Sequence, residues 1–247
     1  MERTSTAVFD FLARERYDDV MLLGTESLRS ASNAGEFRRI IREKSGLKTI
    51  VLSGQKEAHL TFLGALYGLG EKGRKIMVVD VGGGSTEISI GNHGEFSHAV
   101  SVPVGAAGLL MPGTDDSLIA YTIKAEKIIM DIIGGFDLGK TDQLIVAGGT
   151  ITSISAIHKG MKKYDPRAIH GAVLSVEDIM AAASRFEGME RVNREKLIPL
   201  DPQRADLILP GTGIILAILG ISEKNRLRVS TGGLRFGAVL EPELARK

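Results

Sequence analysis

The sequence predicts an α/β protein built from layers of helices and strands. Strand-like and helix-like segments alternate along the 247 residues, which is the pattern of a layered α/β fold. The chain contains 30 glycines and no tryptophan, a composition that suits many tight turns at strand ends. A polar, charged break at 71–75 is the expected domain boundary. The first domain is therefore expected over residues 1–72 and the second over residues 73–247.

The first domain is expected to contain two strands and their helices. An N-terminal helix precedes a short apolar strand. The next helix begins at Asn33, whose side chain can cap it, with Glu36 three residues further on. The expected strands are Tyr17–Leu23 and Leu47–Leu52, and the two later helices are Asn33–Ser45 and Gln55–Tyr67.

The second domain opens with an apolar strand, a run of glycines and a strand in which polar and apolar residues alternate. A hairpin turn at Gly91–Gly94 leads to a third strand. A long helix with one apolar stripe follows. The segment 204–219 resembles a helix, but Pro210 is expected to break or kink it. The expected strands are Ile76–Val81, Thr86–Ile90, Phe96–Val102, Leu144–Ala147 and Leu227–Val229, and further helices are expected near Asp116–Ile133 and Ile179–Phe186.

Composition excludes several classes of function. The formal net charge is +1, from 31 basic and 30 acidic residues, so no broad field for DNA or for a membrane surface is expected. The absence of cysteine removes disulfides, thiol catalysis and thiolate metal sites. The charged N-terminus has no apolar core like that of a signal peptide, and no apolar run approaches the ~20 residues that span a bilayer. We therefore expect a soluble, cytoplasmic protein.

The sharpest chemical feature is the segment Asp80-Val-Gly-Gly-Gly-Ser-Thr-Glu87. Consecutive glycines let the backbone bend tightly and bring its amides against an anion, and the two hydroxyls that follow can add donors. Asp80 and Glu87 flank the loop, where carboxylates can hold a divalent metal ion or orient a water molecule. The candidate phosphate-binding residues are Gly82, Gly83, Gly84, Ser85 and Thr86.

The context of this loop distinguishes it from other phosphate loops. A dinucleotide fingerprint places its glycines between a strand and a helix, and a Walker loop needs a lysine before its helix. Here the glycines join two strands and no lysine follows, which indicates a phosphate-binding hairpin. The alternative is a glycine-rich hairpin with two surface acids.

Two later strand ends carry glycines where a helix begins, which suits phosphate or ribose oxygens. They are Gly148-Gly149-Thr150 and Thr231-Gly232-Gly233. In open α/β sheets such strand ends line the ligand crevice, so Gly148, Gly149 and Thr150 are candidate phosphate-binding residues. Taken singly, each segment also suits an ordinary tight turn.

Two charged residues of the first domain are weaker candidates. Glu57 lies in the first turn of its helix, where a carboxylate can act as a general base or simply favour the helix dipole. Arg29 can bind a phosphate bidentately or be an ordinary exposed arginine. His59, His93 and His170 are spread out and show no spacing typical of metal ligands.

At this point the motifs resemble those of the exopolyphosphatase / guanosine-pentaphosphate phosphohydrolase family. Gly24–Asn33 is similar to its Ala-Thr-Ser-Ala-Leu-Arg-Asp-Ala-x-Asn segment, and Ser53–Leu60 to its Ser-Gly-x-Glu-Glu-Ala-Arg-Leu segment. Asp80–Glu87 matches its Asp-x-Gly-Gly-Gly-Ser-x-Glu loop without a gap. The match continues in order through Ala147–Thr152, Ile169–Gly171, Leu200–Asp206 and Gly233–Gly237.

The resemblance implies an actin-like fold of two ribonuclease-H-like lobes, with an active site that releases terminal phosphate from polyphosphate or guanosine pentaphosphate with the help of Mg²⁺. It makes Glu57 the general base and Arg29 a phosphate contact. It makes Asp80 and Glu87 the carboxylates that hold the metal and the water, with Gly82–Ser85 as the phosphate cradle.

The chain also departs from the family pattern. The family opens with an Asp-x-Gly-Ser-Asn-Ser phosphate loop that this sequence does not contain, so we expect a complete second lobe and a first lobe truncated at its N-terminus. Lys56 and His59 replace a glutamate and an arginine. These departures keep open a second hypothesis, a nucleotide- or polyphosphate-binding module that is completed by a partner chain or a second copy. A sugar- or acetate-kinase-type phosphotransferase is a third.

Overall fold

The structure is a computed structural model that describes residues 2–15, 19–70, 73–92, 95–110, 117–134, 137–198 and 204–241. The chain forms two compact units, residues 1–57 and residues 58–247. Their boundary falls inside helix α4 (Gly54–Leu66) rather than at the polar break, because the later part of α4 packs on the sheet of the second unit. Residues 71 and 72 of that break lie outside the described residues. The lobe boundary between residues 72 and 73 stays a prediction.

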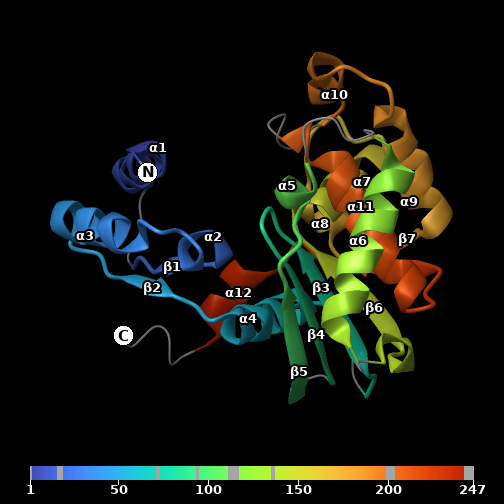
Figure 1. The fold of residues 1–247 in the computed structure, drawn as a ribbon, viewed down its shortest axis with the longest axis horizontal. Helices are drawn as coiled ribbons and strands as arrows, with labels where there is room; N and C mark the ends of the chain where they lie inside the picture. Colours follow the sequence, from blue (N-terminus) through green and yellow to red (C-terminus); the bar gives the residue numbers. More distant parts are fainter. Residues whose placement is uncertain are drawn as a thin grey trace. The chain divides into compact units, whose positions relative to one another are not determined.

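Unit 1 pairs two short parallel strands and packs helices beside them (Figure 1). Strand β1 begins later than expected, at Leu22, and residues 17 and 18 of the expected strand are not described. Asn33 occupies the N-cap of α3, as expected, but its side chain makes no capping hydrogen bond. The elements are α1 (Glu2–Arg14), β1 (Leu22–Gly24), α2 (Glu26–Arg29), α3 (Ala34–Ser45), β2 (Thr49–Val51) and the start of α4.

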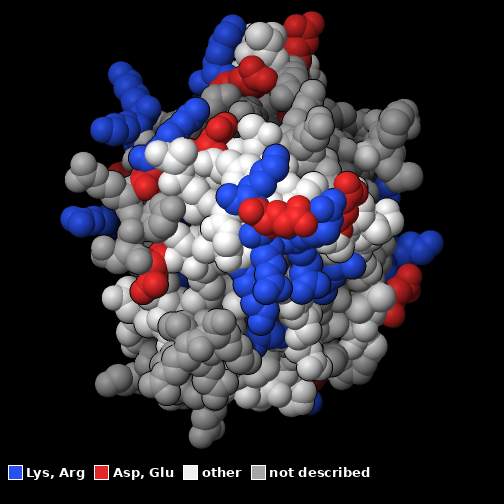
Figure 2. All heavy atoms as spheres, turned by 90° about the vertical axis from the view of Figure 1, so that its left-hand side faces the viewer, with Lys and Arg blue, Asp and Glu red and all other residues white. Residues whose placement is uncertain are grey.

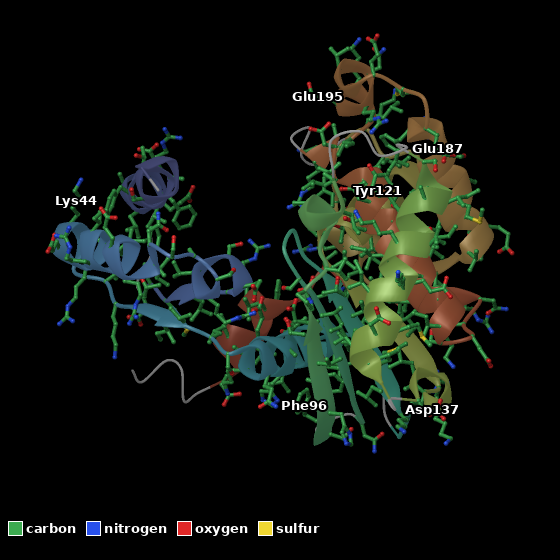
Figure 3. All side chains as sticks on the ribbon, in the orientation of Figure 1. Lys44, Phe96, Tyr121, Asp137, Glu187 and Glu195 are labelled. Atoms are coloured by element: carbon green, nitrogen blue, oxygen red, sulfur yellow. The ribbon has the colours of Figure 1, made fainter. Side chains whose placement is uncertain are left out.

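Helix α3 separates its apolar and charged sides. Phe37 and Ile41 are buried, while the basic residues Arg38, Arg39 and Arg42 are exposed. Lys and Arg side chains gather on the face of the molecule shown in Figure 2. In the last turn, Lys44 extends over the ring of Phe9, with 5.7 Å from Nζ to the ring centroid (Figure 3). Arg42 and Lys44, the basic residues in the last turn of α3, complement the negative end of the helix dipole. This accounts for part of the positive charge on the helix.

Unit 2 is organised around a mixed six-stranded sheet in the order β5-β4-β3-β6-β8-β7 (Figure 1). Strands β3, β6 and β8 are parallel, whereas β4, β5 and β7 join through antiparallel pairs. The expected strands are confirmed, and β7 is one that the sequence did not suggest. The strands are β3 (Ile76–Val81), β4 (Thr86–Asn92), β5 (Glu95–Val102), β6 (Gln143–Ala147), β7 (Val173–Ser175) and β8 (Arg226–Val229). Residues 93 and 94 of the expected Gly91–Gly94 turn are not described.

Helices cover both faces of this sheet. Met77 and Val79 of β3 face the larger core, to which α6, α7, α9 and α11 contribute, whereas Ile76 and Val78 face α4. Tyr121 of α6 packs where Gly213 of α11 has no side chain, and a Cβ there would collide with it (Figure 3). The remaining helices are α5 (Ala106–Leu109), α6 (Leu118–Ile133), α7 (Gly149–His158), α8 (Pro166–Ile169), α9 (Val176–Ala183), α10 (Arg191–Leu197), α11 (Ile208–Ile221) and α12 (Leu234–Leu240).

The expectation that Pro210 breaks or kinks a helix over 204–219 was wrong. Helix α11 begins only at Ile208, so Pro210 lies in its first turn. The amides of a first turn have no partner inside the helix, and a proline there costs no hydrogen bond. Within the described ranges, no helix is both long enough and apolar enough to cross a membrane.

Candidate active site

The glycine loop joins two antiparallel strands, as the sequence predicted, and no helix follows Ser85. The amide of Gly82 donates to the carbonyl of Ser85 at 2.9 Å and closes the turn. The carbonyls of Gly82 and Gly83 accept from the amides of Ala106 and Ala107, each at 2.9 Å. Among the described residues, the amides of Gly83 and Gly84 have no acceptor. The loop is therefore held by its carbonyls, and two amides remain for a ligand.

A second glycine makes this anchoring possible. A Cβ at Gly105 would overlap the backbone of Gly83 and Gly84, so only glycine lets the start of α5 approach the loop. Val104, just before Gly105, accepts the hydroxyl of Thr86 at 2.6 Å. Thr86 has no exposed surface, so its hydroxyl serves the fold and is not offered to solvent.

Asp80 and Glu87 are direct cross-strand partners in the β3–β4 ladder. Partners of this kind place their side chains on the same face, and two like charges there repel unless other groups balance them. Glu87 is only 3% exposed, and its Oε1 accepts hydroxyls from Ser85 at 2.7 Å and Ser101 at 2.8 Å. The hydroxyl of Ser85 therefore supports Glu87, a role that the sequence did not indicate. The pair closes the hairpin whose loop carries the two amides without an acceptor, although Gly82–Ser85 and Glu87 are not among the residues that line the cavity around Asp80.

A cavity of about 520 Å³ lies at the strand ends of β3, β6 and β8. Asp80 reaches this edge, since a Cβ on Gly148 would lie 2.8 Å from its Oδ1 and one on Gly233 would lie 3.7 Å from its Oδ2. Gly148 adopts φ +103°, a conformation that favours glycine, and α7 begins at the next residue. The lining residues are Asp80, Gly148, Gly149, Thr152, Tyr164, Arg204 and the turn and first residues of α12, Ser230–Phe236.

The structure separates the expected residues of the second strand end. Gly148 and Gly149 line the cavity, but Thr150 is not among the lining residues. Thr150 is 5% exposed and packs against Gly211, where a Cβ would overlap its hydroxyl. Thr152, two positions further along α7, is the threonine that lines the cavity.

Arg204 lines the cavity, although no sequence pattern marked it as a site residue. Its guanidinium lies so close to Gly149 that a Cβ on that glycine would overlap it. The sequence signal that could have identified Arg204 is its place in the Leu200–Asp206 motif. Residues 200–203 of that motif are not described. Arg235, on the first turn of α12, adds a second basic side chain to the lining.

Arg29 and Glu57, the candidates in unit 1, contact each other. Nη1 of Arg29 lies 2.6 Å from Oε2 of Glu57 and 2.9 Å from the carbonyl of Leu52. Nη2 lies 2.9 Å from Oε2 of Glu26. Burial lowers the pKa of Arg29, but the hydrogen bonds and charges of Glu57 and Glu26 outweigh it and hold that pKa above its usual value. Glu57 is 8% exposed, so this carboxylate is neither an ordinary exposed helix-start residue nor separate from Arg29.

Comparisons with known proteins agree with these motifs. A profile of the Ppx/GppA phosphatase family matches residues 1–245. The chain is 30% identical over 229 residues to exopolyphosphatase 2 of Mycobacterium tuberculosis, which covers 86% of this chain and 71% of that protein. It is 28% identical over 231 residues to the bifunctional 3-dehydroquinate synthase/phosphatase of Fusobacterium nucleatum. That match covers 90% of this chain and 34% of that protein. The chain thus spans only a third of that relative.

Solved structures show the same fold. A Ppx/GppA enzyme of Aquifex aeolicus superposes with a TM-score of 0.77 at 30% identity, over 97% of this chain and 81% of that one. An exopolyphosphatase of Cytophaga hutchinsonii superposes with a TM-score of 0.85 at 21% identity, over 99% and 80%. The expected actin-like α/β architecture is confirmed.

Proposed function

Because this chain belongs to the Ppx/GppA phosphatase family, we propose that it is a hydrolase that releases terminal phosphate from inorganic polyphosphate or from guanosine pentaphosphate. Relatives named for each substrate are similar to it. One is exopolyphosphatase 2. Another is the guanosine-5'-triphosphate,3'-diphosphate pyrophosphatase of Vibrio campbellii, which is 28% identical over 232 residues; the match covers 44% of that protein.

One observation carries the proposal. Asp80 and Glu87 are paired across the β3–β4 hairpin, and the loop between them leaves the amides of Gly83 and Gly84 without an acceptor among the described residues. Preorganised amides are effective where negative charge develops on a transferred phosphoryl group, because they need no rearrangement during the reaction. Nearby carboxylates suit the positioning of a metal ion or a water molecule.

The donor set fits Mg²⁺. Within the described ranges there is no group of three or more His, Asp and Glu side chains that could form a complete protein cage. Mg²⁺ is commonly bound by one or two carboxylates together with substrate phosphates and waters. Asp80 and Glu87 would hold such an ion, which neutralises charge on the phosphate oxygens when bound.

In the proposed reaction, water attacks the terminal phosphorus, and the bond from that phosphorus to the bridging oxygen breaks. Glu57 accepts the proton of the attacking water, and the shortened chain leaves with the bridging oxygen. The amides of Gly83 and Gly84 stabilise the charge on the transferred group. Arg29 donates to Oε2 of Glu57 and so orients this carboxylate.

The direct test is phosphate release from polyphosphate and from guanosine pentaphosphate in the presence of Mg²⁺. We expect release by the wild type and its loss in Asp80→Asn and Glu87→Gln. Asp137→Asn is the matched control, since Asp137 sits in an exposed pair with Lys140. Release that persists in both site variants rules out the assignment of this loop.

A second candidate function is a binding module that needs another chain. Its support is the sheet of unit 1, which among the described residues consists only of β1 and β2, each three residues long. Sheets of two short strands are marginal alone, and their edges are open to a further strand. Mass measurement in solution separates the two candidates: a monomer with full activity excludes the module, whereas an inactive protein that becomes active on self-association favours it.

A further inference from the structure

We propose that His170 is the positioning residue for the cavity wall formed by Thr231, Gly232 and Gly233, and that it acts as a neutral imidazole with its proton on Nε2. The inference rests on the proposed function, because this wall belongs to the cavity beside Asp80. In the sequence, His170 stood out as a histidine without metal-ligand spacing and as part of the Ile169–Gly171 match, with no role attached.

The ring of His170 bridges two elements of unit 2. Its Nε2 lies 2.9 Å from the carbonyl oxygen of Tyr67, just beyond the end of α4. Its Nδ1 lies 3.2 Å from the amide nitrogen of Thr231 and 3.3 Å from the hydroxyl of that residue. One side chain therefore ties the turn after β8 to the end of α4.

These partners allow one protonation state. A backbone amide can only donate, so Nδ1 must be an acceptor without a proton. A carbonyl can only accept, so Nε2 must carry the proton. A ring protonated on both nitrogens would point an N–H at the amide of Thr231 and lose that contact. The bridge thus assigns a neutral ring and a single tautomer.

Neighbouring contacts fix the rest of the wall to the same helix. The hydroxyl of Ser230 donates to the carbonyl of Ala65 at 2.9 Å and accepts the amide of Gly232 at 3.1 Å. A Cβ on Gly232 would overlap the carbonyl oxygen of Gly64, so the two backbones touch. Arg228 donates to the carbonyl of Gly171, the residue after His170, at 3.3 Å and to that of Leu69 at 3.4 Å.

His170 has a distinct task in this arrangement, because it alone among these side chains binds the amide of Thr231. The turn that begins at Thr231 ends at Gly233, which faces Asp80. A Cβ added to Gly233 would lie 3.7 Å from Oδ2 of Asp80. Thr231, Gly232 and Gly233 line the cavity and supply no reacting group of the proposed reaction. Loss of the bridge should therefore displace the wall and weaken substrate binding without removing a reacting group.

The first test uses the wild type and needs no activity. Nitrogen-15 NMR of histidine-labelled protein at pH 8 distinguishes the two neutral tautomers of each ring. We expect the His170 signals of an Nε2–H tautomer. A ring protonated on Nδ1 overturns the inference, and it does so whether or not the chain proves to be a hydrolase.

The second test compares variants in the phosphate-release assay. His170→Leu removes both hydrogen bonds, whereas His170→Asn keeps an acceptor oxygen near the place of Nδ1. We expect KM to rise about tenfold in the leucine variant, the size of the lost hydrogen bond to the Thr231 amide, with kcat changed less. In the asparagine variant, KM should return most of the way to the wild-type value. His158→Leu, at the far end of α7, is the control. Equal KM in wild type and His170→Leu, or no recovery with asparagine, contradicts the role.

Discussion

Arg29 and Glu57 form a short ion pair, with 2.6 Å between Nη1 and Oε2. Family resemblance gave these residues separate tasks, a phosphate contact and a proton acceptor. Their contact links the tasks, because the carboxylate proposed as base is held by the guanidinium. The carbonyl of Leu52 and the carboxylate of Glu26 fix that guanidinium in turn. Arg29 is thus the residue that positions Glu57 within unit 1.

This network predicts an unequal response to the same conservative change. Arg29→Lys should lower the free energy of unfolding by about 1–3 kcal/mol, since lysine cannot reproduce the fork and the partners of Arg29 are largely buried. Arg39→Lys should cost less than about 0.5 kcal/mol, because the Arg39–Glu43 pair is more than half exposed. Urea unfolding of both variants measures the difference. Equal losses would show that the buried network is not what stabilises unit 1.

Glu57→Gln tests the proposed base while keeping the size of the side chain. We expect phosphate release to fall about 10²–10⁴-fold, the usual contribution of general base catalysis, with little change in KM. Glu43→Gln, on the exposed side of α3, should leave the rate unchanged. A rate within a few fold of wild type in Glu57→Gln would assign the proton to another acceptor.

Glycines around the loop should separate stability from binding. A Cβ on Gly83 meets no atom within 4 Å, so Gly83→Ala should keep the melting temperature yet raise KM by obstructing the free amides. Gly105→Ala should lower the melting temperature, because its Cβ would overlap the backbone of Gly83. Thermal unfolding and steady-state kinetics of the pair check this. An unchanged KM in Gly83→Ala argues that phosphate does not approach these amides.

Ser101 should tune the metal requirement through Glu87, whose carboxylate accepts its hydroxyl. Removing a hydrogen bond to a metal ligand typically weakens metal binding about tenfold or more, so Ser101→Ala should need about tenfold more Mg²⁺ for half-maximal release. Ser97→Ala is a close control, because Ser97 lies on the same strand but donates to the carbonyl of Ile90. Removal of Mg²⁺ by a chelator should abolish release in all three proteins. Identical Mg²⁺ curves for the two serine variants would contradict the role of Glu87.

The phosphate loop could be predicted from the sequence because its signals are local. Asp80 and Glu87 bracket a short glycine run between two strand patterns, and a tight hairpin makes them cross-strand partners. Strand ends at Gly148 and Gly232 were predictable for the same reason, since apolar strands followed by glycines leave few alternatives. The glycine loop and these strand ends could therefore be predicted from neighbouring residues in the sequence alone.

Side-chain contacts between distant segments could not be predicted in this way. Arg29 and Glu57 are 28 positions apart, and His170 and Thr231 are 61 apart. Thr150 matched a helix-start position, but burial against Gly211 decided which threonine faces the cavity. Pro210 was misjudged because the start of α11 depends on packing, which no local pattern reveals.

In the proposed mechanism, the amides of Gly83 and Gly84 receive the phosphate. Selective nitrogen-15 labelling of glycine, with tripolyphosphate titrated into the Glu57→Gln variant in the presence of Mg²⁺, measures this directly. We predict that the Gly83 and Gly84 amide signals shift together and saturate, while those of Gly134 and Gly160, glycines at the ends of α6 and α7, stay in place. Binding that leaves the Gly83 and Gly84 signals unmoved would exclude these amides as the phosphate site.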